Sequence, residues 1–248
     1  MALYRQFVRP VLEYACPAWT PDLAQTHLEM LQRTQNAALR IATGCVRSTP
    51  TAHLHAETKV LPLKPHVDMR GVQCFAAASR QDHPLHTLYL AVGTRRQIHT
   101  TPSAHFRALR AQIPPLPPQR KESSWIHESF VSKALSDAAP NSSLGEVPPP
   151  IASDELSLPR RCRVDLAHLR CGHHLSLRSY ENRLRTEVDP NCRWCGSSPE
   201  TVSHIFQECP TLAGARADRG ITGPRALWSN PALSLDFLRS IGLLPNPQ

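Results

Sequence analysis

Residues 189–210 read DPNCRWCGSSPETVSHIFQECP and carry four side chains with the spacing of a metal site. The pattern is Cys192-x2-Cys195-x8-His204-x4-Cys209. Two Cys separated by two residues can turn back so that both thiolates reach one ion, and Gly196 permits the tight turn. Three thiolates and one imidazole suit Zn²⁺ and leave no open coordination position. The sequence therefore predicts one structural zinc ion, which folds a small module with little core of its own.

The N-terminal sequence indicates where such a site would operate. Residues 1–15 include Arg5, Arg9 and Glu13, so they lack the uninterrupted apolar stretch of a signal peptide. No window approaches 18 consecutive apolar residues, so we expect no transmembrane helix and no membrane partner. We expect an intracellular, reducing environment, which disfavours a disulfide among these Cys. Two buried Cys beside a chance His are the other alternative to a zinc site.

The balance of charge points to a polyanionic partner. Lys and Arg number 28 against 20 acidic residues, which gives a net charge of +8. Only four of the 28 are Lys, so 24 are Arg. Arg forms bidentate bonds to phosphate and stacks on bases better than Lys does. This composition indicates RNA or DNA as the partner, although a GC-rich coding sequence also raises the Arg content.

A basic segment, residues 160–193, leads into the Cys pattern. It holds eight Arg and four acidic residues, interleaved with His and Tyr rings. Arg side chains neutralise phosphates and flat rings stack on bases, so the segment fits nucleic-acid binding. The plainer interpretation is a solvated helix face with pairs such as Glu181–Arg185. The residues expected to contact nucleic acid are Arg170, His173, His174, Arg178, Tyr180, Arg183, Arg185 and Arg193.

Three regions of different character predict a mainly α fold. Residues 1–92 show the apolar spacing of an N-terminal helical bundle. Residues 93–159 hold ten Pro and predict a Pro-rich linker that is largely irregular. Residues 160–248 predict Arg/His-rich helices and a C-terminal helix around a small zinc-knuckle module.

Local start and stop signals place the helices within these regions. Pro at the first turn marks a helix start, and Gly after the last apolar position marks a helix end. The expected helices cover residues 22–43, 50–58, 65 onward, 160–169, 175–184 and 233–241, with short ones in the linker over 105–112 and 125–138.

Two parts of the chain resemble the reverse transcriptases of jockey-like non-LTR retrotransposons. The segments LYRQFVRPVLEYACPAW (3–19), LQRTQNAALRIATGC (31–45) and HLHAETKVLPLKPHVDM (53–69) resemble the thumb that follows the polymerase palm. The segment LRCGHHLSLRSYENRL (169–184) and the four predicted ligands resemble the C-terminal CCHC zinc knuckle and its lead-in helices. The resemblance covers residues 1–90 and 160–212 and is poor in the Pro-rich middle.

The resemblance implies a grip on nucleic acid without polymerase chemistry. In the family, the thumb holds the template–primer duplex, and Arg33 and Arg40 lie seven apart on one helix face of that region. The family's palm carries an Asp-Asp pair that holds catalytic Mg²⁺, and this chain contains no Asp-Asp pair. The resemblance therefore implies a fragment of a mobile-element RNA-directed DNA polymerase that is not an enzyme by itself, binds RNA or DNA, and acts in the nucleus.

Several alternatives stay open at the level of sequence. The chain can be a zinc-stabilised protein-interaction module or a non-functional retroelement remnant. Its N-terminal half can also fail to fold without the palm, which would expose the stripe of Leu28, Leu31 and Ala38. A zinc deaminase is rejected, because His55-Ala56-Glu57 matches only half of its signature and the second half is absent.

Overall fold

The computed structural model describes residues 1–87, 102–137 and 152–245. Within these ranges the backbone is helical and forms no strand apart from a single antiparallel bridge between Asn191 and Pro199. The predicted mainly α fold is therefore confirmed. No helix in the described ranges has both the length and the apolar content needed to cross a bilayer.

The chain divides into two compact units that interleave along the sequence. The first comprises Met1–Leu39 and Val60–Ala138, and the second comprises Arg40–Lys59 and Ala139–Gln248. These units differ from the three domains predicted from sequence, because residues 40–59 group with the C-terminal part and helices of the supposed linker group with the N-terminal part.

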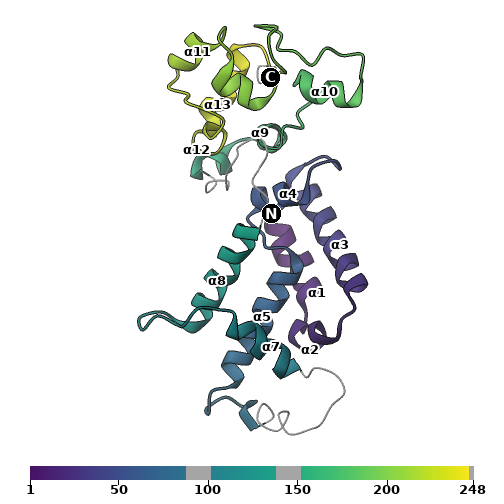
Figure 1. Cartoon of the computed structure of the whole chain (residues 1–248), viewed down its shortest axis with the longest axis vertical. Coiled ribbons are helices and arrows are strands. Elements are labelled where there is room, and N and C mark those ends of the chain that lie inside the picture. The colour runs from purple at the N-terminus through teal and green to yellow at the C-terminus, as the bar shows by residue number, and fades with distance from the viewer. Residues whose placement is uncertain (88–101, 138–151, 246–248) are drawn as a thin grey trace. The chain divides into compact units, whose positions relative to one another are not determined.

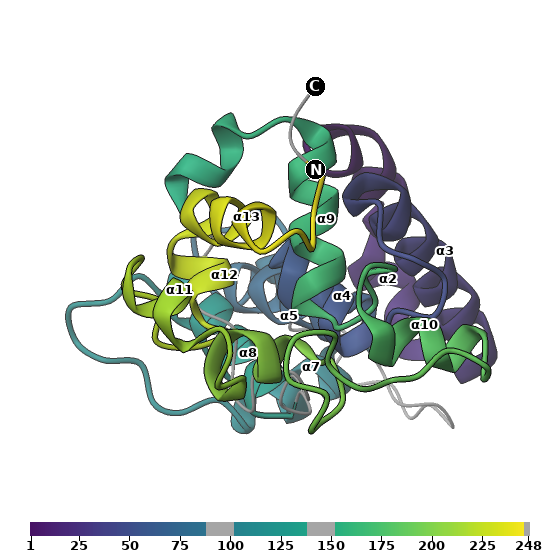
Figure 2. The same ribbon diagram turned by 90° about the horizontal axis from the view of Figure 1, so that it is seen from above.

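The first unit is built around helix α5 (Leu63–Ala78), which lies between α3 (Gln25–Thr43) and α8 (Glu122–Asp137) in Figure 1; Figure 2 shows the same ribbon from above. Leu28 of α3 packs with Leu63 and Val67 of α5, so the predicted apolar stripe has a partner within the chain. The unit's other helical segments are the π-helical turn η1 (Tyr4–Val8), α1 (Arg9–Glu13), α2 (Cys16–Trp19), the 3-10 turn η2 (Thr20–Asp22) and α7 (Pro102–Ala111).

The two short helices predicted inside the Pro-rich segment, over residues 105–112 and 125–138, are confirmed as α7 (Pro102–Ala111) and α8 (Glu122–Asp137). Their grouping with the first unit was not predicted. Phe106 of α7 and Ile126 of α8 are buried against Val72 of α5. The Pro residues bracket these helices rather than interrupt them: Pro102 begins α7, where its missing N–H has no helical partner to lose. Predicted linker residues 93–101 and 138–151 lie outside the described residues.

The second unit joins a short N-terminal segment to the C-terminal helices. Its core contains Leu166 and Leu169 of α9 together with Trp228, Phe237 and other buried apolar side chains. The elements are α4 (Thr51–Thr58), the 3-10 turn η4 (Ser153–Ser157), α9 (Arg160–Arg170), α10 (Arg178–Leu184), the π-helical turn η5 (His204–Glu208), α11 (Ala213–Ala217), α12 (Ala226–Ser229) and α13 (Pro231–Ser240).

Specific polar contacts explain why residues 40–59 belong to this second unit. His168 Nε2 lies 2.8 Å from the carbonyl oxygen of Gly44, and the hydroxyl groups of Ser48 and Tyr180 are 3.1 Å apart. Such side-chain contacts between residues more than 100 positions apart leave no periodic pattern in the sequence, so the predicted boundary at residue 92 missed them.

We predict that Gly71→Ala destabilises the first unit. Ala normally stabilises a helix interior by about 1 kcal/mol relative to Gly. At Gly71, however, an added Cβ would lie 2.0 Å from the buried ring of Phe106, so we expect a net loss of about 1–3 kcal/mol. Gly214→Ala in α11 is the control, because a Cβ added there would meet no atom within 4 Å beyond its chain neighbours and the backbone of its own helix. Urea unfolding compares the two variants, and a stabilised Gly71→Ala would contradict the packing of α7 on α5.

Candidate metal centre

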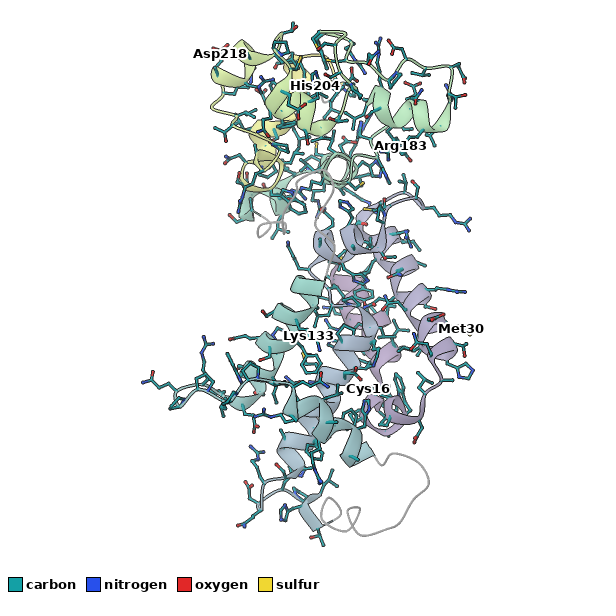
Figure 3. All side chains as sticks on the ribbon, in the orientation of Figure 1. Cys16, Met30, Lys133, Arg183, His204 and Asp218 are labelled. Atoms are coloured by element: carbon teal, nitrogen blue, oxygen red, sulfur yellow. The ribbon has the colours of Figure 1, made fainter. Side chains whose placement is uncertain are left out.

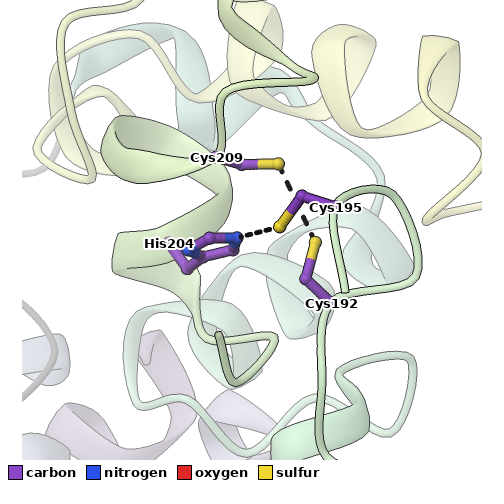
Figure 4. A group of neighbouring side chains, drawn as sticks. All are labelled: Cys192, Cys195, His204 and Cys209. Carbon is purple, nitrogen blue, oxygen red and sulfur yellow. Dashed lines mark hydrogen bonds between the residues drawn. The ribbon is translucent and has the colours of Figure 1, made fainter. Parts of the chain in front are cut away.

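The four predicted ligands lie together in the second unit, on two segments that face each other (Figure 4). Cys192 and Cys195 come from a loop, and His204 and Cys209 come from the opposite side, at the two ends of η5. The four ligand atoms all lie within 4.8 Å of one another. Three of the ligands are buried, and Cys195 is partly exposed.

Two of the distances between ligand atoms are close to those around a tetrahedral ion. Zn–S bonds of about 2.3 Å and Zn–N bonds of about 2.0 Å place two sulfurs about 3.8 Å apart, and a sulfur and a nitrogen about 3.5 Å apart. The sulfurs of Cys192 and Cys209 are 3.8 Å apart, and Cys195 Sγ lies 3.2 Å from Nε2 of His204. All eight cysteines are free thiols. The cluster can hold one metal ion, and its three sulfurs and one nitrogen favour zinc.

Backbone hydrogen bonds shape the loop that carries the first two ligands. The Cys192 N–H donates to the Ser198 carbonyl at 2.8 Å, and the Gly196 N–H donates to the Cys192 carbonyl at 2.8 Å. Gly196 has a φ of +69°, in the left-handed region that residues with a Cβ rarely adopt. The predicted tight turn after the second Cys is therefore confirmed.

A π-helical turn brings the other two ligands to the same side. His204 and Cys209 are five residues apart, which would separate them by about 140° on an ordinary α-helix of 3.6 residues per turn. The Cys209 N–H instead donates to the His204 carbonyl at 2.7 Å, which closes the wider turn. Single π-turns of this kind are frequent at functional sites.

The pKa values of the two loop thiols, Cys192 and Cys195, are shifted in opposite directions. Burial raises the pKa of the Cys192 thiol to about 11, against the opposing effect of nearby backbone N–H groups. Hydrogen bonds from the side chain and the backbone of Ser197 lower the pKa of the Cys195 thiol to about 6. A lowered pKa favours the thiolate, the form in which Cys binds a metal.

Sequence reasoning missed Glu200, which holds in place the loop that carries Cys192 and Cys195. This loop, residues 186–200, is called the metal loop below. The Glu200 side chain is fully buried and accepts hydrogen bonds from the backbone N–H groups of Arg178 and Arg193 at 3.1 and 3.0 Å. The Arg193 guanidinium also donates to this carboxylate, at 2.7 and 2.9 Å, and to the carbonyl of Ser176. Arg193 is paired with this carboxylate but is itself exposed, so its contact with nucleic acid stays a prediction.

The structure contradicts the prediction that Arg170 contacts nucleic acid, because this side chain is buried and has a structural role. The side chain is 1% exposed. The guanidinium pairs with Glu57 at 2.7 Å and with Glu155 at 2.5 Å, donates to the Leu227 carbonyl at 2.7 Å, and lies 4.1 Å from the centre of the Trp228 ring. The two carboxylates outweigh burial, so the pKa of the guanidinium is raised and the charge is retained.

The flat rings predicted to stack on bases lie inside the unit. His173 and Tyr180 are buried and stack on each other, with ring centres 4.8 Å apart. His174 is buried as well, 3.5 Å from a carboxylate oxygen of Asp165. Burial lowers the pKa of His173, so this ring is neutral at pH 7. The structure therefore contradicts the prediction that these three rings are available to bases.

The remaining predicted contacts are at or near the surface. Arg33, Arg183 and Arg185 are exposed. Arg40 is partly buried and donates to the Thr49 carbonyl at 3.0 Å, and Arg178 lies 3.4 Å from the Asn191 carbonyl. Figure 3 shows Arg183 on α10, apart from His204 of the metal cluster.

Comparison with known proteins yields no match to any family model, curated protein or solved structure.

We predict one zinc ion per chain, which is removed by substitution of a ligand. Cys192→Ser and His204→Ala each remove one of four ligands and should abolish stoichiometric zinc, which elemental analysis of purified protein measures. Cys74→Ser is the control, because this exposed thiol lies outside the cluster. Folded wild-type protein without zinc would contradict the assignment.

We predict that Arg170→Ala destabilises the second unit by about 3–5 kcal/mol, because it leaves two buried carboxylates without their partner. Arg163→Ala, on the exposed face of the same helix, should change stability by about 0.5 kcal/mol or less. Urea unfolding of the zinc-loaded protein, followed by Trp fluorescence, compares them. If the two substitutions lowered the free energy of unfolding equally, the ion pairs of Arg170 would contribute nothing to stability.

Proposed function

We propose that this chain is a zinc-stabilised nucleic-acid-binding fragment of a mobile-element reverse transcriptase that lacks the catalytic palm. The resemblance of the thumb-like and knuckle-like segments supports the origin. The observation that carries the binding role is a set of exposed arginines on α9 and α10, built on the same core as the metal cluster. In this proposal the chain grips RNA or DNA in the nucleus and performs no chemistry on it.

Positive and negative charges lie on different segments of the second unit, and this distribution favours α9 and α10 as the surface that contacts nucleic acid. Residues 160–185 contain seven Arg and two acidic residues, a formal charge of +5. Residues 186–209 contain one Arg and four acidic residues, a formal charge of −3. Three thiolates around one Zn²⁺ add a further net negative charge. Phosphates would therefore approach α9 and α10 and be repelled by the metal loop.

In this proposal, the metal loop contributes to nucleic-acid binding by fixing the position of α10. The Glu200 carboxylate accepts a hydrogen bond from the backbone N–H of Arg178, the first residue of α10, and the Ser179 hydroxyl donates to the Glu200 carbonyl at 2.7 Å. Cys192 and Cys209 also share a core with Leu177 and Tyr180. A bound ion fixes this loop, and through it the orientation of the arginines that follow.

Phosphate contact, rather than base stacking, is the mode that the exposed side chains support. Arg161, Arg163, Arg183 and Arg185 are exposed, whereas the neighbouring rings are buried. Arg–phosphate contacts supply salt-dependent affinity with little sequence information. We therefore propose binding that depends strongly on ionic strength and weakly on base identity.

A protein-interaction module is the second candidate, and one feature of the first unit favours it. Leu3, Phe7, Val11 and Tyr14 on the N-terminal helical segment are between 67% and 80% exposed. Exposed apolar side chains in such a row are typical of surfaces that contact another macromolecule. Under this alternative, nucleic-acid affinity would be absent or insensitive to the arginines of α10.

We predict that Arg183→Ala with Arg185→Ala weakens nucleic-acid binding and flattens its salt dependence. For every phosphate that the variant no longer neutralises, the slope of log K against log salt should fall by about 0.9 for duplex DNA. Fluorescence anisotropy of a labelled oligonucleotide across a salt series measures both quantities.

The control is Arg80→Ala with Arg107→Ala, which removes the same charge from exposed positions of the first unit. If both double variants lowered affinity equally, the loss would follow from net charge alone, and Arg183 and Arg185 would have no specific role in binding. Wild-type protein with no salt-dependent affinity would contradict the proposed function and favour the protein-interaction module.

A further inference from the structure

The imidazole of His204 has a buried nitrogen that the metal ligation leaves unused. Its Nε2 faces the Cys195 sulfur at 3.2 Å, so Nε2 is the atom that would bind the ion. Its Nδ1 is buried and has no hydrogen-bond partner among the described residues. A neutral imidazole that offers the Nε2 lone pair must carry its proton on Nδ1. This buried N–H needs an acceptor, because an unsatisfied buried donor is costly.

Glu208 is placed to supply that acceptor. Its Oε2 lies 3.6 Å from Nδ1 of His204, slightly beyond hydrogen-bonding distance. The Glu208 side chain is 59% exposed, so a small change of rotamer can close the gap. Both residues lie on η5, at its first and last positions. The same π-helical turn that orients His204 and Cys209 therefore also presents the carboxylate to the ring.

The loop ligands obtain their outer hydrogen bonds differently. Backbone N–H groups of Trp194 and Cys195 point to the Cys192 sulfur, and Ser197 provides its backbone and hydroxyl to Cys195. Apart from the Ser197 hydroxyl, these donors are backbone groups that come with the fold of the loop. For Nδ1 of His204, the acceptor group that the structure places close by is the side-chain carboxylate of Glu208.

We propose that Glu208 is a positioning residue for the metal centre: it accepts the Nδ1–H bond of His204, fixes the ring's tautomer and orientation, and so raises the affinity of the site for zinc. This inference rests on the metal site within the proposed function. Carboxylate partners of metal-binding His residues act in this way, and their removal typically weakens metal affinity by about 10- to 100-fold.

The test is a zinc titration of the full chain against a chromophoric chelator, with Glu208→Ala, Glu208→Gln and Glu187→Ala beside wild type. Glu208→Ala should weaken zinc affinity by about 10- to 100-fold. Glu208→Gln keeps an acceptor oxygen and should recover most of that affinity. Glu187→Ala removes the same charge from another exposed position of the metal-loop segment and should bind zinc like wild type.

A spectroscopic readout separates positioning from a general effect on folding. In ¹⁵N-labelled zinc-loaded protein, the Nδ1–H resonance of His204 should persist in wild type and Glu208→Gln and exchange with water in Glu208→Ala. Wild-type affinity in Glu208→Ala, with zinc still bound, would overturn the role of Glu208 and leave the metal site intact. Wild-type protein that binds no zinc would overturn the metal site itself.

Discussion

The second unit depends on one buried cation. The Arg170 guanidinium joins Glu57 of α4, Glu155 of η4 and the Leu227 carbonyl of α12, and it lies over the Trp228 ring. Three segments thus meet at a single side chain of α9. A charge buried in this way is tolerated only while all its partners are in place, because an unpaired one is strongly unfavourable. The guanidinium therefore makes the arrangement of these segments all-or-none.

The metal centre and the basic helices use this scaffold for different purposes. The metal ligands lie on a loop and a π-helical turn, and the arginines lie on α9 and α10. Both groups of segments pack on the same apolar core. A stable core allows negative thiolates and positive guanidinium groups to be held apart within a small unit. In the proposed function, this separation would leave the basic helices as the surface that phosphates approach.

The sequence predicted most of the helices and the ligand set, because both follow local rules. The Cys192–Cys209 spacing, the turn at Gly196 and helix α9 each depend on residues close together in the chain. The roles of Arg170, His173 and Tyr180 were wrong, because burial is decided by distant partners such as Glu57. The short helices of the Pro-rich segment were predicted, but their packing on the first unit was not, because it depends on contacts of Phe106 and Ile126 with residues of α5.

The interleaving of the two units has a consequence for synthesis on the ribosome. The first unit ends at residue 138, so every segment of it is synthesised before the C-terminal helices are. Residues 40–59 emerge early as well, but their partners in α9, α10 and α12 come more than 100 residues later. Domains generally fold in the order in which they are made. The first unit can therefore close while this segment waits, and translation that stops early leaves the segment without its partners.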